Sequence, residues 1–89
     1  MNKLVVYSAG GAVSTTAQLS RTRPLGEEIV RFLRASNPNL KGLTAQEISV
    51  WWEDMECDPR SSLLELGIPK GDVLEVELRF MLNEEQKQP

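Results

Sequence analysis

The 89-residue sequence contains no histidine and a single cysteine, Cys57, and each scarcity excludes a class of chemistry. Without histidine the chain cannot build a Ser-His triad, a histidine general base or the common histidine-containing zinc sites. A lone cysteine cannot form an internal disulfide or a thiolate cluster. The neighbouring Glu56 and Asp58 would raise the pKa of its thiol, so we expect a small buried hydrophobic residue. We therefore predict a non-enzyme without cofactors or metals.

The sequence also lacks long apolar runs and any clustered excess of basic charge. No stretch approaches the ~20 apolar residues of a membrane-spanning helix, and the apolar run at 4–7 ends at once in Ser-Ala-Gly-Gly, unlike a signal peptide. The formal net charge is −3, whereas nucleic acids and anionic membranes select clustered basic faces. With one cysteine, these features predict a cytoplasmic or otherwise intracellular protein in a reducing compartment, whose partner is another protein.

The first half of the sequence predicts a hairpin followed by one helix. Residues 3–8 are β-branched and aromatic and residues 12–19 alternate, so we expect two strands joined by the intervening Ala-Gly-Gly. Between residues 20 and 40 the period changes, and four apolar residues fall on one helical stripe: Leu25, Ile29, Phe32 and Leu33. Thr22 is the expected N-cap, and Ser-Asn-Pro-Asn at 36–39 ends the helix.

The second half predicts strands separated by short polar segments. Residues 47–52 form the third strand, and Met55 and Cys57 anchor a short edge strand. Residues 62–68 suggest one short helical turn. Residues 73–80 alternate strictly, which places four apolar side chains on one face of the last strand: Leu74, Val76, Leu78 and Phe80.

This order of elements predicts an α+β fold. One helix packed on one face of a four- to five-stranded mixed sheet buries all the apolar faces in a single core, which is the β-grasp arrangement. The helix acts as a crossover and permits parallel pairing at the centre of the sheet. We predict one domain over residues 1–81 and a solvated polar tail over residues 82–89, where a linker to further sequence could begin.

Residues 48–80 resemble the ubiquitin family, most clearly in Ser-Leu-Leu-Glu-Leu-Gly-Ile-Pro-Lys-Gly-Asp-Val-Leu-Glu-Val-Glu-Leu-Arg-Phe at the end of this range. The resemblance implies that Ile68 is a buried residue before the last strand, and that Cys57 and Val50 face the core. The sequence departs from the family after Gly71, because no later glycine can supply the C-terminal Gly-Gly used in conjugation. We expect a non-conjugated ubiquitin-like domain, built into the N-terminus of a larger protein.

The two adjacent tryptophans must point to opposite faces of the third strand. Placing Trp51 inward would also turn Ser49 inward and expose Ile48 and Val50, so we predict that Trp52 faces the core or its rim and Trp51 faces outward. Two explanations of Trp51 stay open. It contacts a partner, or it is covered by a local segment such as the loop before this strand or the C-terminal tail.

The resemblance implies that the outward face of the third and last strands is a recognition surface. We therefore predict a protein–protein interaction module, an adaptor or scaffold, whose partner carries a basic and apolar segment. Carboxylates around a large aromatic side chain favour such a partner. The candidate binding residues are Trp51, Ser49, Glu75, Glu77, Arg79 and Tyr7, with Val5 as an alternative to Tyr7.

A second hypothesis comes from the acidic run Glu53, Asp54, Glu56 and Asp58. The run lacks the glycine and distal glutamate of a calcium loop. It resembles the acidic motif of PB1 domains, β-grasp modules that assemble head to tail, and the resemblance implies that Lys3 on the first strand is the basic partner. The second half of that motif is absent, since Pro-Arg-Ser-Ser follows. We expect a monomer and keep head-to-tail self-assembly, with a scaffold role, as the alternative.

Overall fold

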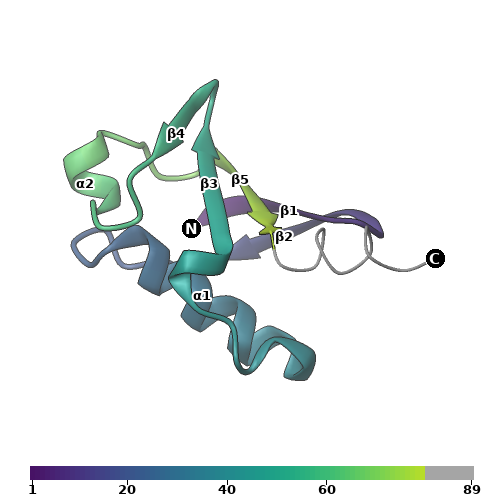
Figure 1. The fold of residues 1–89 in the computed structure, drawn as a ribbon. Helices are drawn as coiled ribbons and strands as arrows, with labels where there is room; N and C mark the ends of the chain where they lie inside the picture. Colours follow the sequence, from purple (N-terminus) through teal and green to yellow (C-terminus); the bar gives the residue numbers. More distant parts are fainter. Residues whose placement is uncertain (80–89) are drawn as a thin grey trace.

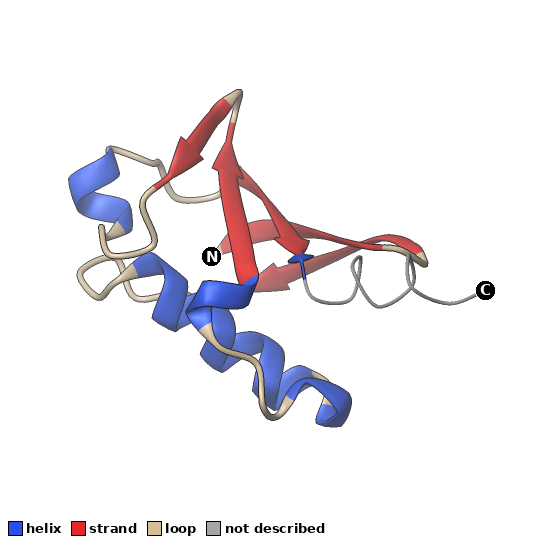
Figure 2. Ribbon diagram, viewed as in Figure 1, coloured by secondary structure: helices blue, strands red, loops and turns tan. Residues whose placement is uncertain are grey.

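A computed structural model describes residues 1–79 of the chain. A five-stranded sheet in the order β2-β1-β5-β3-β4 carries one main helix, α1, along one face (Figures 1 and 2). The central strands β1 and β5 pair in parallel, and the other neighbours pair antiparallel. The predicted α+β β-grasp arrangement is therefore confirmed. The strands and helices are β1 (Asn2–Ser8), β2 (Gly11–Ala17), α1 (Leu25–Ser36), β3 (Ile48–Trp52), β4 (Met55–Cys57), α2 (Leu63–Leu66) and β5 (Val73–Leu78).

The core lies between α1 and the sheet face that the strand alternation makes apolar. The strands contribute Leu4, Ile48, Val50, Leu74, Val76 and Leu78, all buried. The predicted helical stripe meets them, with Leu25, Ile29 and Leu33 buried and Phe32 partly buried against the cluster. Ile68 and Cys57 are also buried, as the sequence predicted. Phe80 and the predicted tail at 82–89 lie outside the described residues.

Helix α1 begins three residues later than Thr22, so the predicted N-cap is wrong. Pro24 occupies the N-cap position and makes no side-chain cap. The first-turn amides are instead satisfied by a distant loop, because Leu25 N donates to the Ser61 carbonyl at 2.8 Å and Gly26 N donates to the Pro59 carbonyl at 2.9 Å. A carbonyl from another segment can replace a capping side chain.

The loop at Pro59 approaches α1 so closely that a side chain at residue 26 would have to displace it. A Cβ atom added at Gly26 would lie 2.6 Å from the Cβ of Pro59. This contact ties the segment after β4 to the helix, and β4 itself is three residues long. The short β4 pairs with Val50, Trp51 and Trp52 alone.

The predicted helical turn before β5 is confirmed as α2. Ser62 and Glu65 form a reciprocal capping box: the Ser62 hydroxyl accepts from Glu65 N at 3.1 Å, and the Glu65 carboxylate accepts from Ser62 N at 2.8 Å. Gly67 closes the turn with a φ of 73°. Two short 3₁₀ segments, η1 (Pro38–Leu40) and η2 (Ala45–Glu47), link α1 to β3. Among residues 1–79, no helix has the length and apolarity to cross a membrane.

Candidate functional site

The sheet face that points away from α1, here called the outer face, is built by the alternate residues of β1, β5 and β3. Register places Val5, Glu75 and Trp51 side by side, with Glu56 of β4 as the next neighbour of Trp51. Directly opposed residues on neighbouring strands have Cβ atoms roughly 5 Å apart, so their side chains interact. Trp51 therefore stands between two glutamates.

The two tryptophans lie on opposite faces of β3, as the sequence predicted. Trp52 packs against the core, and its indole Nε1 donates to a carboxylate oxygen of Asp72 at 3.0 Å. Trp51 lies on the outer face and is partly exposed. The indole Nε1 of Trp51 is itself buried, and no acceptor among residues 1–79 pairs with it.

A depression of about 520 Å³ opens on the outer face beside Trp51. Four of the residues predicted for partner binding line it: Tyr7, Trp51, Glu75 and Glu77. Glu53 and Asp54, which the sequence assigned to the alternative acidic surface, line the same depression, as does Ser8. Ser8 was not predicted, because strict alternation along β1 assigns it to the opposite face from Tyr7.

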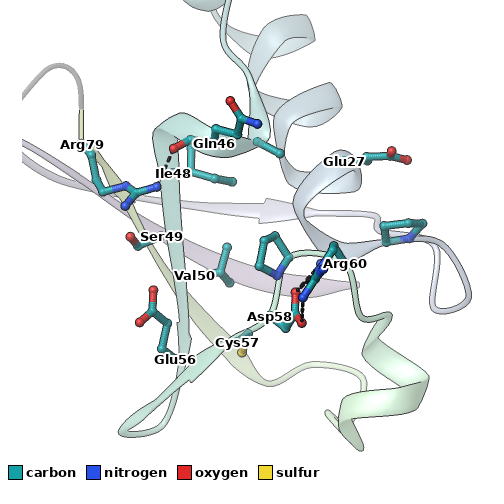
Figure 3. Close-up of a pocket in the computed structure, with 13 residues that line it drawn as sticks. Glu27, Gln46, Ile48, Ser49, Val50, Glu56, Cys57, Asp58, Arg60 and Arg79 are labelled. Carbon is teal, nitrogen blue, oxygen red and sulfur yellow. Dashed lines mark hydrogen bonds and ion pairs between the residues drawn. The ribbon is translucent and has the colours of Figure 1, made fainter.

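Ser49 and Arg79 were predicted for the same surface but line a different hollow. This second hollow, of about 570 Å³, lies between β3, the segment after β4 and the start of α1 (Figure 3). Arg79 lies near the start of β3 and donates to the Gln46 carbonyl. Ser49 lies opposite Glu77 on the same face of β3 as Trp51, and it also borders the second hollow. The predicted residues therefore line two hollows, although Ser49 shares the outer face with Trp51.

Tyr7 and Glu75 form a hydrogen bond across the depression. Among the described residues that line it, this is the one hydrogen bond between two side chains. The Tyr7 hydroxyl donates to Glu75 Oε2 at 2.8 Å. This hydrogen bond is the main cause that raises the pKa of Tyr7 above its ordinary value, with smaller contributions from desolvation and from the negative charge of Glu75. The bond crosses from β1 to β5 and orients the Glu75 carboxylate.

The tight turn between β3 and β4 supplies the other two carboxylates of the depression. Trp52 pairs with Met55, so the turn contains only Glu53 and Asp54. Glu53 has a φ of 57°, the one positive φ of a non-glycine residue within residues 1–79. A left-handed conformation costs an ordinary residue roughly 1–2 kcal/mol, and two-residue hairpin turns usually place glycine or asparagine there. The chain keeps a glutamate at this position.

The acidic run of the alternative hypothesis spans two neighbouring hollows, and Glu56 lies beside Trp51 on the outer face. Glu53 and Asp54 line the outer depression, whereas Glu56 and Asp58 line the second hollow. Asp58 is also paired with Arg60 at 3.2 Å, and its hydrogen bonds with Arg60 lower the pKa of the Asp58 carboxyl. Lys3 is exposed on β1 opposite Val73, on the same outer face as Trp51.

Cys57 is buried at the end of β4, in the environment that the sequence predicted. Burial is the main cause that raises the pKa of its thiol; a backbone hydrogen bond at Trp52 lowers it and the nearby Glu56 charge raises it further. A raised pKa and burial both oppose reactivity. Within the described part of the chain, no three acidic or cysteine side chains are placed to hold a metal ion.

Comparisons with known proteins support the fold. No family model matches the chain, and no curated protein matches it. The chain is similar to a crystal structure of ATBAG1 in complex with HSP70, with a TM-score of 0.60 and 15% identity over 97% of this chain and 45% of that chain. This chain thus spans less than half the length of the ATBAG1 chain.

A second similar structure is an NMR solution structure of a computationally designed protein based on human erythrocytic ubiquitin. Its TM-score is 0.52 and its identity is 26%, over 88% of this chain and 91% of that chain. This comparison and the sheet order agree with the resemblance that residues 48–80 carry. The chain therefore has a ubiquitin-like β-grasp fold.

Proposed function

We propose that this chain is a non-catalytic protein-interaction module that binds a segment of a partner protein through the outer face around Trp51. One observation carries the proposal. Trp51 lies on the side of the sheet away from α1, where the core does not need it, while the next residue, Trp52, packs against the core. Tryptophan buries up to ~250 Å² in a complex and is enriched among residues that dominate binding energy.

The surroundings of Trp51 favour a partner segment that combines apolar and basic residues. Glu75 and Glu56 flank Trp51 across the ladder, and Glu77 lies further along β5. Carboxylates around an aromatic anchor attract a basic segment, raise its association rate and fix its orientation. The anchor itself requires an apolar pocket or groove on the partner.

The fold comparison supports a binding role in general terms only. ATBAG1, which shares the fold over 45% of its chain, has been crystallised in complex with the protein HSP70. A fold hosts many functions, so the partner of ATBAG1 does not transfer to this chain. The proposal for this chain therefore rests on the residues of its own outer face.

Affinity capture from a cell extract with the wild-type chain and Trp51→Ala tests the proposal. Leu64→Ala is the matched control, because Leu64 is 62% exposed on α2 and lies outside the outer face. Bound proteins are identified and quantified by mass spectrometry. We expect partners that the wild type and Leu64→Ala retain equally and that Trp51→Ala loses by at least roughly tenfold. Equal capture by all three chains would contradict the proposal, provided that circular dichroism shows Trp51→Ala to be folded.

A further inference from the structure

We infer that the depression beside Trp51 accepts the guanidinium group of an arginine side chain in the partner. The inference rests on the proposed function, since it names the group that the outer face recognises. It goes further by fixing the chemistry of the contact and by assigning Glu53 and Asp54 to the same site.

The depression has a surplus of negative charge that the described residues do not neutralise. Four carboxylates line it, those of Glu53, Asp54, Glu75 and Glu77, and neither lysine nor arginine does. The two ion pairs found within residues 1–79 join other residues, Arg23 with Glu28 and Arg60 with Asp58. Arg79, four residues beyond Glu75, is directed to the Gln46 carbonyl. A cation is the complementary ligand.

The depression also offers many hydrogen-bond acceptors and almost no free donors. Its side chains include two strong donors, the Tyr7 hydroxyl and the Trp51 indole N–H, and the weaker hydroxyl of Ser8. The Tyr7 hydroxyl already donates to Glu75, and the Trp51 Nε1 atom is buried. Ionised carboxylates only accept hydrogen bonds. The ligand must therefore supply donors, which excludes anions and carbonyl-rich ligands.

The placement of the carboxylates favours an extended organic cation over a metal ion. No group of three acidic side chains in the described chain is close enough to bind a metal. Glu75 and Glu77 are alternate residues of β5, so their Cα atoms are roughly 7 Å apart on one face. The guanidinium group carries five N–H donors in a planar fork and can contact separated carboxylates at once.

The aromatic side chains of the depression favour arginine over lysine. Tyr7 and Trp51 belong to β1 and β3, the strands on either side of β5, and they flank the two glutamates. A guanidinium stacks on aromatic rings while its edge pairs with carboxylates, whereas an ammonium is a compact and strongly hydrated charge. The depression therefore combines aromatic rings with separated carboxylates, and this combination is complementary to a guanidinium group.

The test uses the full 89-residue chain and capped tripeptides as probes: Gly-Arg-Gly, Gly-Lys-Gly and Gly-citrulline-Gly. Citrulline keeps the shape of arginine but is neutral. Each peptide is titrated into the labelled protein, and two-dimensional NMR follows the Trp51 indole and the amides of Tyr7, Glu75 and Glu77. We expect the arginine peptide to bind with a millimolar Kd, which corresponds to a binding free energy of about −4 kcal/mol. Its affinity should fall as salt is added.

Two substitutions with the same change in charge provide the matched comparison. Glu77→Gln removes a carboxylate of the depression. It should lower the affinity for the arginine peptide roughly tenfold, because hydrogen bonds to charged groups are stronger than those between neutral groups. Glu27→Gln removes an exposed carboxylate on α1, outside the depression, and should leave the affinity unchanged. Equal weakening by both would mean that net charge alone attracts the peptide, and it would overturn the inference.

The other outcomes separate this inference from the proposed function. Equal binding of the lysine or citrulline peptide, or no perturbation around Trp51, would overturn the assignment to arginine. If a captured partner depends on Trp51 but binds Glu77→Gln as tightly as the wild type, the interaction module stands and the arginine site fails. If the arginine peptide binds here but Trp51→Ala captures every partner, the arginine site stands and the proposed function fails.

Discussion

At the scale of single residues, the two tryptophans are separated by the period of the strand. Alternation along β3 was sufficient to predict that Trp52 belongs with the core and Trp51 with the outer face. The hydrogen bond from Trp52 to Asp72 could not be predicted, because Asp72 lies in the turn before β5 and only the folded sheet brings the two residues together. The indole N–H of Trp51, in contrast, has no hydrogen-bond partner among the described residues.

Tyr7 reports directly on the outer face, because it is the only tyrosine in the sequence. Its hydrogen bond to Glu75 raises the pKa of the phenol, so the absorbance change of phenolate formation should occur at a higher pH than in the unfolded chain. Glu75→Ala removes the acceptor and the charge and should return the midpoint toward about pH 10, the ordinary tyrosine value. A midpoint that Glu75→Ala does not shift would contradict this contact.

The same shift has a defined effect on stability. A group whose pKa is raised by folding stabilises the protein below its unfolded pKa, and this stabilisation is lost as the pH rises through the folded pKa. For Tyr7 the loss begins near pH 10 and is complete above the raised value. Tyr7→Phe should lack this alkaline component of the unfolding curve.

At the scale of elements, the start of α1 depends on a contact that the sequence does not reveal. The loop carbonyls of Pro59 and Ser61 cap the helix, and Gly26 permits their approach. Gly26→Ala should lower the free energy of unfolding by about 1–3 kcal/mol, measured by urea denaturation, because the added methyl group overpacks a backbone contact. Without that clash, alanine in a helix would be stabilising.

Gly42→Ala is the control for this substitution. Gly42 has no heavy atom within 4 Å of its added Cβ, so its replacement should change the free energy of unfolding by no more than about 0.5 kcal/mol. If Gly26→Ala is as stable as Gly42→Ala, the loop does not pack on the helix as described.

The elements that the sequence predicted well are those defined by local patterns. Strict alternation identified β5, and the helical stripe identified α1. Ser62 and Glu65, which cap α2, belong to the turn that was expected at residues 62–68. That Ser49 and Arg79 line the second hollow could not be predicted. Residues 56–60 wall the second hollow, and the approach of Pro59 to Gly26 that holds this segment against α1 has no local pattern in the sequence.

At the scale of the whole molecule, the placement of charge bears on self-assembly. Lys3, Glu53 and Asp54 lie on the same outer face, so a contact between them would bring two outer faces together. Such a contact between equal surfaces closes into a dimer, whereas head-to-tail polymers need two different surfaces. A head-to-tail polymer of the PB1 type therefore does not follow from these residues, and the monomer stays our prediction.

Size-exclusion chromatography over a range of protein concentrations tests this expectation. We expect one elution volume that is independent of concentration and unchanged by Lys3→Glu. Growth of the assembly with concentration, reversed by Lys3→Glu, would instead support self-assembly through Lys3 and the acidic residues.

The central claim is that Trp51 serves binding and not folding. Titration calorimetry of a captured partner against the wild type, Leu64→Ala and Trp51→Ala measures it most directly, with urea denaturation of each chain alongside. Trp51→Ala should lose about 2 kcal/mol or more of binding free energy, roughly 30-fold in Kd, and about 1 kcal/mol or less of unfolding free energy. An unchanged Kd, or a Trp51→Ala chain that does not fold, would contradict the account.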